Sequence, residues 1–457
     1  MVTIYFDKQL FSYLFNAKEE KYIILRDKIL SHKDDFVFLF SDAHLLDLQQ
    51  DSTDIKYKEM DFMQSIVGEN CLICKDSNIV VANESPRSAF SHFANTQQLS
   101  WLDNFDLSQI PKEQYDFINN AIDLSIKDLK GELELDWITK RTPIHTNELN
   151  VNKDEFSSFL KFIMANLYDK KDTYKAMRDV AMENYNPTKI TADGDRVFND
   201  QLSSSPLGLS FINLIKAVSN QLGMSSLGFG MAYFLSYTLL DLLGICREPR
   251  KKVKIRNMQT DSFHSFFGTY CDCIVSDDEG VRVKSKILYR LFNVETQVYS
   301  IDEFIGQFDK AINDNRKTAR EYFDEIRNDY EQKEVLHTEN HSEYTITQLK
   351  AAHKYFGYFN HIFERESKDG TVIMLHKNIN IKNSIYVHEV EIIVNRITRI
   401  FNSMGAEIKL FDKETDWEQI RSENWRRGVD FNDAEAYLAK FKDIPALFFL
   451  IEFKNPN

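Results

Sequence analysis

The first hundred residues alternate between short apolar runs and amphipathic segments. Residues 3–6 and 36–40 are continuous runs of aliphatic, β-branched or aromatic side chains, which is typical of strands buried on both faces. Each run is followed by apolar positions three and four residues apart, as in a helix that covers a sheet. This alternation predicts an α/β fold with a parallel, doubly wound sheet.

A long helical region interrupts the strand–helix alternation. Residues 106–246 show helical periodicity and no strand pattern, and strand patterns return only after residue 258. We therefore predict one α/β domain built from residues 1–105 and 247–305, split by a mainly helical insertion. Residues 306–457 are expected to form a smaller α/β or α+β domain.

The last domain has its own apolar pattern. Strands are predicted at residues 372–375, 407–411 and 446–451, and an amphipathic helix at residues 386–401. No motif in this region indicates a function.

Composition and charge narrow the function classes. The chain has 457 residues, of which 43% are hydrophobic and 28% charged, as in ordinary globular proteins. A formal net charge of -14 argues against binding nucleic acid through overall charge, so a polyanion must meet a local basic patch or bound cations. Five cysteines and the absence of a signal-peptide pattern favour a cytoplasmic location.

One apolar segment is a candidate for a transmembrane helix. Residues 223–246 are largely apolar and long enough in principle to span a bilayer. However, Asp241, several Gly and Ser residues and the lack of an aromatic belt favour a buried helix pair. We expect no membrane partner.

Four carboxylates occupy equivalent places in the strand–helix order. Asp7 ends the first strand, and Asp47 lies on the helix after the second. Asp261 is expected to begin a late helix, and Asp278 follows a late strand. Because strand ends and the first turns of adjacent helices converge on one edge of a parallel sheet, the four are predicted to lie together. Mg²⁺ or Mn²⁺ would offset their mutual repulsion.

Three further residues are secondary candidates: His44, His264 and Asp277. His264 lies one turn after Asp261 and would project towards the same edge. Asp277 is an alternative ligand to Asp278. For each histidine, a hydrogen-bonded structural role remains an alternative.

The densest positive run in this acidic chain is residues 247–256. Its position just before Asp261 favours a phosphate-contacting rim, and a solvated connector is the alternative. The candidate RNA-contacting residues are Arg250, Lys251, Lys252, Lys254 and Arg256.

The order of the four acids resembles that of the PIN-domain nucleases. The family's strand-ending aspartate matches Asp7, and its Ser-to-Glu-Leu element is similar to Ser41 through Asp47-Leu48, with Asp in place of Glu. Its third acid corresponds to Asp261. Its Val-Thr-x-Asp ending is similar to Val275-Ser276-Asp277-Asp278. The likeness covers the two halves of the predicted α/β domain.

The resemblance implies a PIN-like fold and metal-dependent endonucleolytic cleavage of single-stranded RNA. Asp7, Asp261 and Asp278 would hold the principal Mg²⁺ or Mn²⁺, and Asp47 a second metal or the attacking water. Lys8 departs from the small or hydroxylic residue usual in the family, and it places a cation beside Asp7.

The helical insertion and the last domain are expected to regulate the activity of such an enzyme. The insertion or the last domain is expected to bind a regulatory protein or to form a homo-oligomer, as in a toxin-like or defence effector. Two alternatives stay open: a flap-type DNA nuclease with the same site, and a degenerate PIN fold that acts as an interaction or regulatory module.

Overall fold

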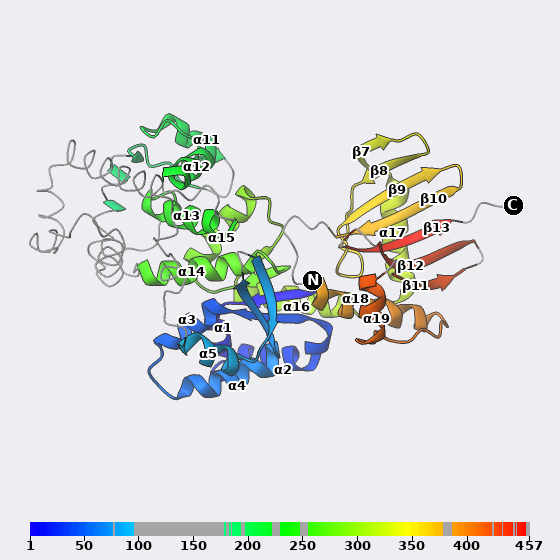
Figure 1. Cartoon of the computed structure of the whole chain (residues 1–457), viewed down its shortest axis with the longest axis horizontal. Coiled ribbons are helices and arrows are strands. Elements are labelled where there is room, and N and C mark those ends of the chain that lie inside the picture. The colour runs from blue at the N-terminus through cyan, green and yellow to red at the C-terminus, as the bar shows by residue number, and fades with distance from the viewer. Residues whose placement is uncertain are drawn as a thin grey trace, which may run out of the picture.

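The structure is a computed structural model. It describes residues 1–75, 78–95, 178–179, 182–183, 185–192, 197–221, 229–246, 255–377, 386–422, 425–431, 433–441, 444 and 446–453. The described residues contain two separate β-sheets, and the second of them lies at the right-hand end of the molecule in Figure 1. We call the parts of the chain built on them the first and second domains.

The first sheet has six strands in the order β4-β3-β2-β1-β5-β6. Their bounds are β1 (Thr3–Phe6), β2 (Val37–Ser41), β3 (Asn70–Lys75), β4 (Asn78–Asn83), β5 (Cys273–Val275) and β6 (Gln297–Tyr299). All neighbours pair in parallel except β3 and β4, which are antiparallel. Ile4 lies opposite Phe38 in β2 and Cys273 in β5, so early and late segments of the chain complete one sheet.

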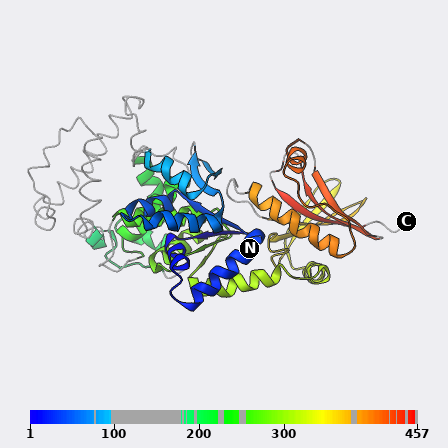
Figure 2. The ribbon, with the colours of Figure 1, turned by 90° about the horizontal axis from the view of Figure 1, so that it is seen from below.

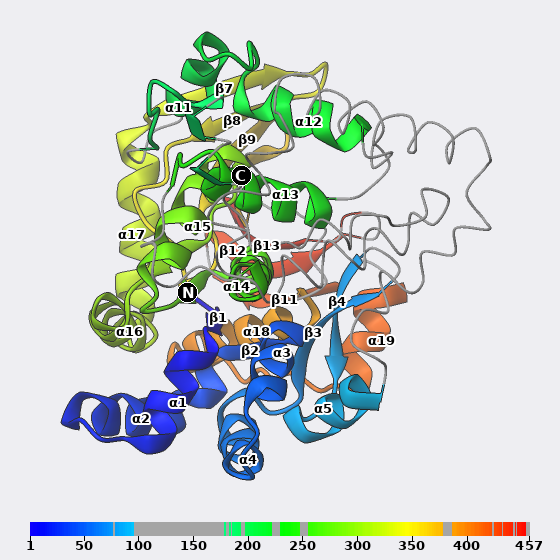
Figure 3. The ribbon, with the colours of Figure 1, turned by 90° about the vertical axis from the view of Figure 1, so that its left-hand side faces the viewer.

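Helices cover both faces of this sheet because its strands are apolar on both sides. Ile4 and Phe6 pack with the helices of one face, and Tyr5 packs with those of the other. The first group is α1 (Lys8–Asn16), α2 (Glu20–His32), α4 (Ile55–Val67), α5 (Pro86–Asn95) and α16 (Ile301–Asp314). The second is α13 (Phe229–Leu242), α14 (Ile255–Gly268) and α15 (Glu279–Leu291), with α11 (Val197–Gln201) and α12 (Phe211–Gln221) beyond them. Figure 3 shows helices of the two groups on opposite sides of β1 to β3. The predicted α/β class with a parallel sheet is confirmed.

The second sheet is antiparallel throughout, in the order β11-β12-β13-β10-β9-β8-β7. The strands are β7 (Val335–Asn340), β8 (Tyr344–Leu349), β9 (His361–Ser367), β10 (Gly370–His376), β11 (Trp425–Asp430), β12 (Ala434–Lys440) and β13 (Leu447–Phe453). Three helices accompany it, α17 (Ala319–Gln332), α18 (Tyr386–Ser403) and α19 (Thr415–Ser422), and α18 runs along the sheet (Figure 2).

The strand predicted at residues 407–411 is wrong, since these residues have no regular secondary structure. Their backbone groups bond to side chains of α18 instead of to a neighbouring strand. The Asn402 amide bonds both N–H and C=O of Ile408, and the Asn395 carbonyl oxygen accepts from the N–H of Phe411. Side-chain bonds to the backbone can take the place of sheet hydrogen bonds in this way.

A buried carboxylate joins the two domains. Oδ2 of Asp272, just before β5, accepts from the N–H of Val2 at 2.5 Å. Its Oδ1 lies 3.0 Å from Nζ of Lys354 and 3.2 Å from Nζ of Lys377, both in the second domain. From the same side, Arg396 of α18 donates to the carbonyl oxygen of Asp35 at 3.0 Å.

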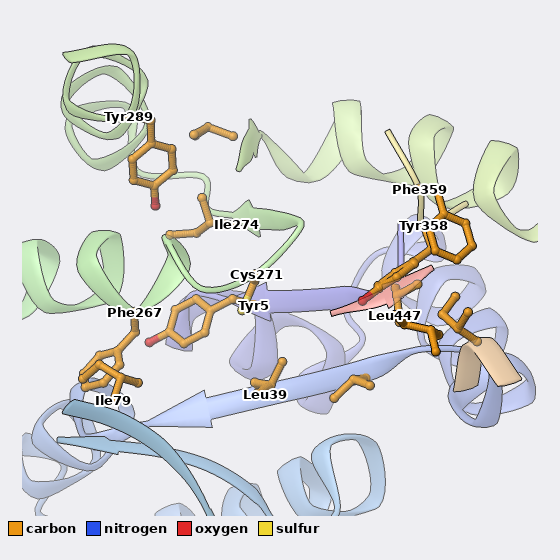
Figure 4. Packing of buried hydrophobic residues seen from close by; sticks show 14 of the residues in the cluster. Tyr5, Leu39, Ile79, Phe267, Cys271, Ile274, Tyr289, Tyr358, Phe359 and Leu447 are labelled. Atoms are coloured by element: carbon orange, nitrogen blue, oxygen red, sulfur yellow. The ribbon is translucent and has the colours of Figure 1, made fainter. Parts of the chain in front are cut away.

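The largest apolar cluster is continuous between the domains. Figure 4 labels members from the first domain (Tyr5, Leu39, Ile79, Phe267, Cys271, Ile274 and Tyr289) and from the second (Tyr358, Phe359 and Leu447). Among the described helices, none combines the length and the apolar character needed to cross a membrane.

Candidate metal centre

Two carboxylates and an imidazole from three elements meet beside the carboxyl end of β1. Asp7 directly follows β1, Asp47 lies on α3 (Asp42–Gln50), and His264 lies on α14. Nε2 of His264 is 2.9 Å from Oδ2 of Asp47 and 4.0 Å from Oδ1 of Asp7. One ligand atom of each side chain lies within 4.8 Å of those of the other two. A group of this size with these donor atoms could hold a divalent metal ion.

Asp7 is oriented by both of its carboxylate oxygens. As the N-cap of α1, it accepts from the N–H of Gln9 through Oδ1 at 3.3 Å. Its Oδ2 accepts from the hydroxyl of Ser276 at 2.6 Å, and its backbone N–H donates to the carbonyl oxygen of Val275 at 2.9 Å. Asp7 is therefore fixed to the ends of both β1 and β5.

The start of α3 fixes the position of Asp47. The Ser41 hydroxyl accepts from the N–H of Ala43 at 3.2 Å, and Nδ1 of His44 accepts from the N–H of Ser41 at 3.1 Å. Nε2 of His44 then donates to the carbonyl oxygen of Phe6 at 2.7 Å. Such a capping box sets the helix entry, and it joins α3 to the end of β1.

His44 therefore serves the backbone. Burial and, to a smaller extent, the neighbouring His264 hold the pKa of His44 well below its usual value. The imidazole is neutral, and both of its nitrogen atoms bond to main-chain groups. The hydrogen-bonded structural role considered for His44 fits this geometry.

A buried tyrosine lies behind His264. The Tyr5 hydroxyl is 2.9 Å from Nδ1 of His264, 2.6 Å from Oγ of Ser41 and 3.4 Å from Nδ1 of His44. Tyr5 is fully buried, so its hydroxyl requires these partners. Tyr5 is not among the site residues predicted from the sequence, although a phenol within a buried strand is a polar group that needs a hydrogen-bond partner.

The charge state of His264 reflects two opposing effects. Burial alone would lower the pKa of His264, but the hydrogen bond to Asp47 and the charges of Asp7 and Asp47 outweigh it and raise the pKa. This raised pKa favours the protonated imidazole, whose charge would offset part of the carboxylate charge here.

The other two predicted ligands lie outside the three-residue cluster. Asp278 caps α15, where its Oδ1 accepts from the N–H of Val281 at 3.1 Å. Its own N–H donates to the Ser276 hydroxyl at 3.1 Å, and that hydroxyl bonds to Asp7. Asp278 is therefore one hydrogen-bonded link away from the cluster, at the same sheet edge.

The prediction that Asp261 begins a helix is wrong. Helix α14 begins at Ile255, because no Gly or Pro interrupts this stretch and Met258 packs in the core. Asp261 is half-buried in the body of α14, one turn before His264. In this turn of the helix, the side chain that joins the cluster is His264.

Two charged neighbours have other partners. The exposed Asp277 accepts from the N–H of Ile301 at 3.1 Å, at the start of α16. Lys8 places its Nζ 3.0 Å from Oε2 of Glu59 and 2.9 Å from Oγ of Ser12. The cation that departs from the PIN pattern is thus paired with a buried carboxylate of α4.

The predicted phosphate-contacting run is mostly outside the described residues. Arg250, Lys251, Lys252 and Lys254 lie there. Arg256 belongs to the first turn of α14, and its side chain is outside the description.

Comparisons of the chain with protein-family models, with curated proteins and with solved structures found no match.

Proposed function

We propose that this protein is a metal-dependent endonuclease of PIN-like fold that cleaves single-stranded RNA. One observation carries the proposal: Asp7, Asp47 and His264 bring their ligand atoms within 4.8 Å of one another beside the carboxyl end of a central parallel strand. Open α/β sheets bind their ligands at this edge.

The donor set favours Mn²⁺ over Mg²⁺. Mg²⁺ is held almost entirely by oxygen, whereas imidazole also suits the first-row transition metals. A divalent cation bound here would lower the pKa of a coordinated water and offset charge on the scissile phosphate. In this proposal Asp7, Asp47 and His264 are the inner ligands, and Asp278 and Asp261 act from the surrounding edge.

The residues around the ligands would keep them in place. The Ser276 hydroxyl directs one oxygen of Asp7, which leaves Oδ1 facing His264. Tyr5 bonds to Nδ1 of His264 and so leaves Nε2 for the centre. Partners of this kind fix ligand orientation and tautomer in metal sites.

Cleavage of labelled oligonucleotides tests the proposal. We expect Asp7→Asn and Asp47→Asn to abolish Mn²⁺-dependent cleavage of single-stranded RNA, with a loss of at least about 100-fold, because each removes a ligand charge. Asp277→Asn is the matched control: it lies on the same loop as Ser276 and Asp278 but bonds to α16, and its activity should be unchanged.

The substrates and the outcomes separate the related functions. Single-stranded RNA, single-stranded DNA and flap DNA of matched sequence are compared, each with Mn²⁺, Mg²⁺ or chelator. Preference for the flap would identify a DNA nuclease with the same centre. Full RNA cleavage by Asp7→Asn and by Asp47→Asn would overturn the proposal.

A second candidate function is a PIN-like interaction module without activity. The hydrogen bond of 2.9 Å between His264 and Asp47, together with the raised pKa of His264, shows how a protonated imidazole could occupy the position of a metal. Calorimetric titration with Mn²⁺ distinguishes the two. No binding at millimolar Mn²⁺ would favour the module, and saturable binding lost in Asp7→Asn would favour the nuclease.

A further inference from the structure

Arg282 places a guanidinium group at the same sheet edge as the candidate metal centre. It lies in the first turn of α15, and its Nη1 donates to the carbonyl oxygen of Ser276 at 3.0 Å. The Ser276 hydroxyl donates to Asp7 at 2.6 Å and accepts from the N–H of Asp278 at 3.1 Å. The guanidinium is therefore linked through a single residue to a proposed metal ligand.

This guanidinium has hydrogen-bonding capacity beyond its contact with Ser276. An arginine side chain carries five N–H donors, and within the part of the chain that the structure describes one of them has an acceptor. Arg282 is half-buried, so solvent reaches part of its side chain. A guanidinium in this situation can bind a phosphate through two parallel hydrogen bonds.

Two other basic side chains beside the centre already have carboxylate partners. Lys8 lies 3.0 Å from Glu59, and His264 lies 2.9 Å from Asp47. Arg282, in contrast, forms no ion pair with the carboxylates of the described residues. Its positive charge is therefore available to an anion that reaches this edge.

The charge of Arg282 acts on one carboxylate of the neighbouring helix. Hydrogen bonds from Ser300 outweigh burial and lower the pKa of Glu303, and the charges of Lys286 and Arg282 add to this lowering. The Glu303 carboxylate belongs to the capping box of α16, where it accepts from the N–H of Ser300 at 2.7 Å. Glu303 thus lies near Arg282 but keeps its hydrogen bond to its own helix.

We propose that Arg282 binds a backbone phosphate of the RNA beside the phosphate that is cleaved, which rests on the nuclease function proposed above. The carboxylates of Asp7, Asp47 and Asp278 would repel a strand of phosphates at this edge. A bound divalent cation offsets charge on the scissile phosphate, and a neighbouring phosphate needs a second positive group. β1 and β5 are adjacent strands, about 4.8 Å apart, so Arg282 lies one strand away from the centre along the sheet edge.

Binding of labelled single-stranded RNA, measured by fluorescence anisotropy with chelator, tests this contact independently of cleavage. We expect Arg282→Ala to weaken binding by about tenfold or more, because hydrogen bonds between charged groups are lost. The slope of log affinity against log salt concentration should fall by about 0.7, as for one phosphate contact on a single strand. Alanine favours helix, so this variant should fold. Arg282→Lys keeps the charge and should keep the slope.

Arg290→Ala is the matched control. Arg290 is exposed near the other end of α15, about 12 Å from Arg282 along the helix axis. Helix α15 leads away from the carboxyl end of β5 towards the start of β6, which is parallel to β5. Arg290 therefore lies towards the opposite edge of the sheet, and its loss should leave RNA affinity and the salt slope unchanged.

Two further measurements separate a phosphate contact from a structural role. Calorimetric titration should give the same Mn²⁺ affinity for Arg282→Ala and wild type. A weaker affinity would mean that Arg282 acts on Asp7 through Ser276, and it would overturn the proposal. A dinucleotide contains only the scissile phosphate, so Arg282→Ala should cleave it with the kcat/KM of wild type and lose about tenfold or more only on longer RNA. An equal loss on both substrates contradicts the contact.

The Arg282 contact and the nuclease function can fail separately. A wild type that cleaves RNA, with an Arg282→Ala variant of equal RNA affinity and salt slope, removes only the Arg282 contact. A wild type that cleaves no RNA removes the nuclease function, and the anisotropy then decides on Arg282. In that case a loss confined to Arg282→Ala supports the phosphate contact, and absence of RNA binding by the wild type overturns it.

Discussion

At the residue scale, the candidate centre depends on a side chain that solvent does not reach. Tyr5 is fully buried, and its hydroxyl bonds to both His264 and Ser41. One phenol thus connects α14 to the start of α3, the two helices that carry the imidazole and Asp47.

Replacement of this tyrosine should affect the metal more than the fold. We expect Tyr5→Phe to weaken Mn²⁺ binding by about 10- to 100-fold, because the partner that orients His264 is lost. The stability cost should be about 1 kcal/mol. Calorimetric titration and chemical denaturation measure the two effects.

Tyr289→Phe is the control for that substitution. Its buried hydroxyl donates to the carbonyl oxygen of Ser265 at 2.6 Å, so the variant should lose similar stability and keep its Mn²⁺ affinity. Equal Mn²⁺ affinity in Tyr5→Phe and wild type would show that Tyr5 has no part in orienting His264.

At the element scale, two carboxylates at the ends of helix α3 have pKa values shifted in opposite directions. Asp42, in its first turn, has its pKa raised to about 6 by burial and by the nearby Glu84. The pKa of Asp51, at its other end, is lowered by hydrogen bonds from Thr53.

These shifts predict a pH dependence of stability. Because the folded form of Asp42 binds its proton more tightly than the unfolded chain does, its contribution is present below about pH 4 and is lost as pH rises through about 6. Asp42→Asn should therefore gain stability relative to wild type across this interval, by up to about 3 kcal/mol. Urea denaturation at several pH values measures it.

Asp51→Asn should change stability in the opposite direction. Wild-type Asp51 stabilises the folded chain as pH rises above its lowered pKa, so this variant should lose stability relative to wild type at neutral pH. A stability difference for Asp42→Asn that does not change with pH would contradict the assignment.

The elements of the first domain follow from the sequence more directly than its site. Continuous apolar runs identify β1 and β2, because strands buried on both faces need apolar residues at every position. The choice between Asp261 and His264 is different in kind. It depends on how α14 is rotated about its own axis against β1 and α3. The packing of Met258 and Phe267 in the core sets this rotation. These two residues are farther apart than the positions of a short sequence motif, so a motif does not reveal it.

In the second domain, side-chain bonds from a packed helix likewise decide the local structure in a way that the sequence pattern does not reveal. Residues 407–411 have the composition of a strand, but Asn395 and Asn402 of α18 bond to their backbone. Neither partner is adjacent in sequence, so composition alone predicts the wrong element.

At the scale of the whole molecule, the Asp272 junction should make the two domains unfold together. Burial would raise the pKa of Asp272, but Lys354 and Lys377 outweigh it and hold the pKa well below its usual value. The junction therefore contributes stability at neutral pH that is lost as pH falls below about 4.

Removal of that charge should uncouple the domains. We expect Asp272→Asn to cost about 2 to 3 kcal/mol, because it removes a buried charged acceptor of the Val2 N–H and of the Lys354 and Lys377 ammonium groups, and to split one calorimetric transition into two. Asp302→Asn breaks an exposed pair with Lys21 and should cost less than about 1 kcal/mol. A single unshifted transition in Asp272→Asn would contradict this role.

The order of strands also sets when the centre can exist during synthesis. β1 pairs with β5, which comes late in the chain, and Asp47 precedes His264 by 217 residues. Since a nascent chain leaves the ribosome from its N-terminus, its carboxylates emerge long before the imidazole. If the protein cleaves RNA, it therefore stays inactive while most of its own message is being translated, without any separate inhibitor.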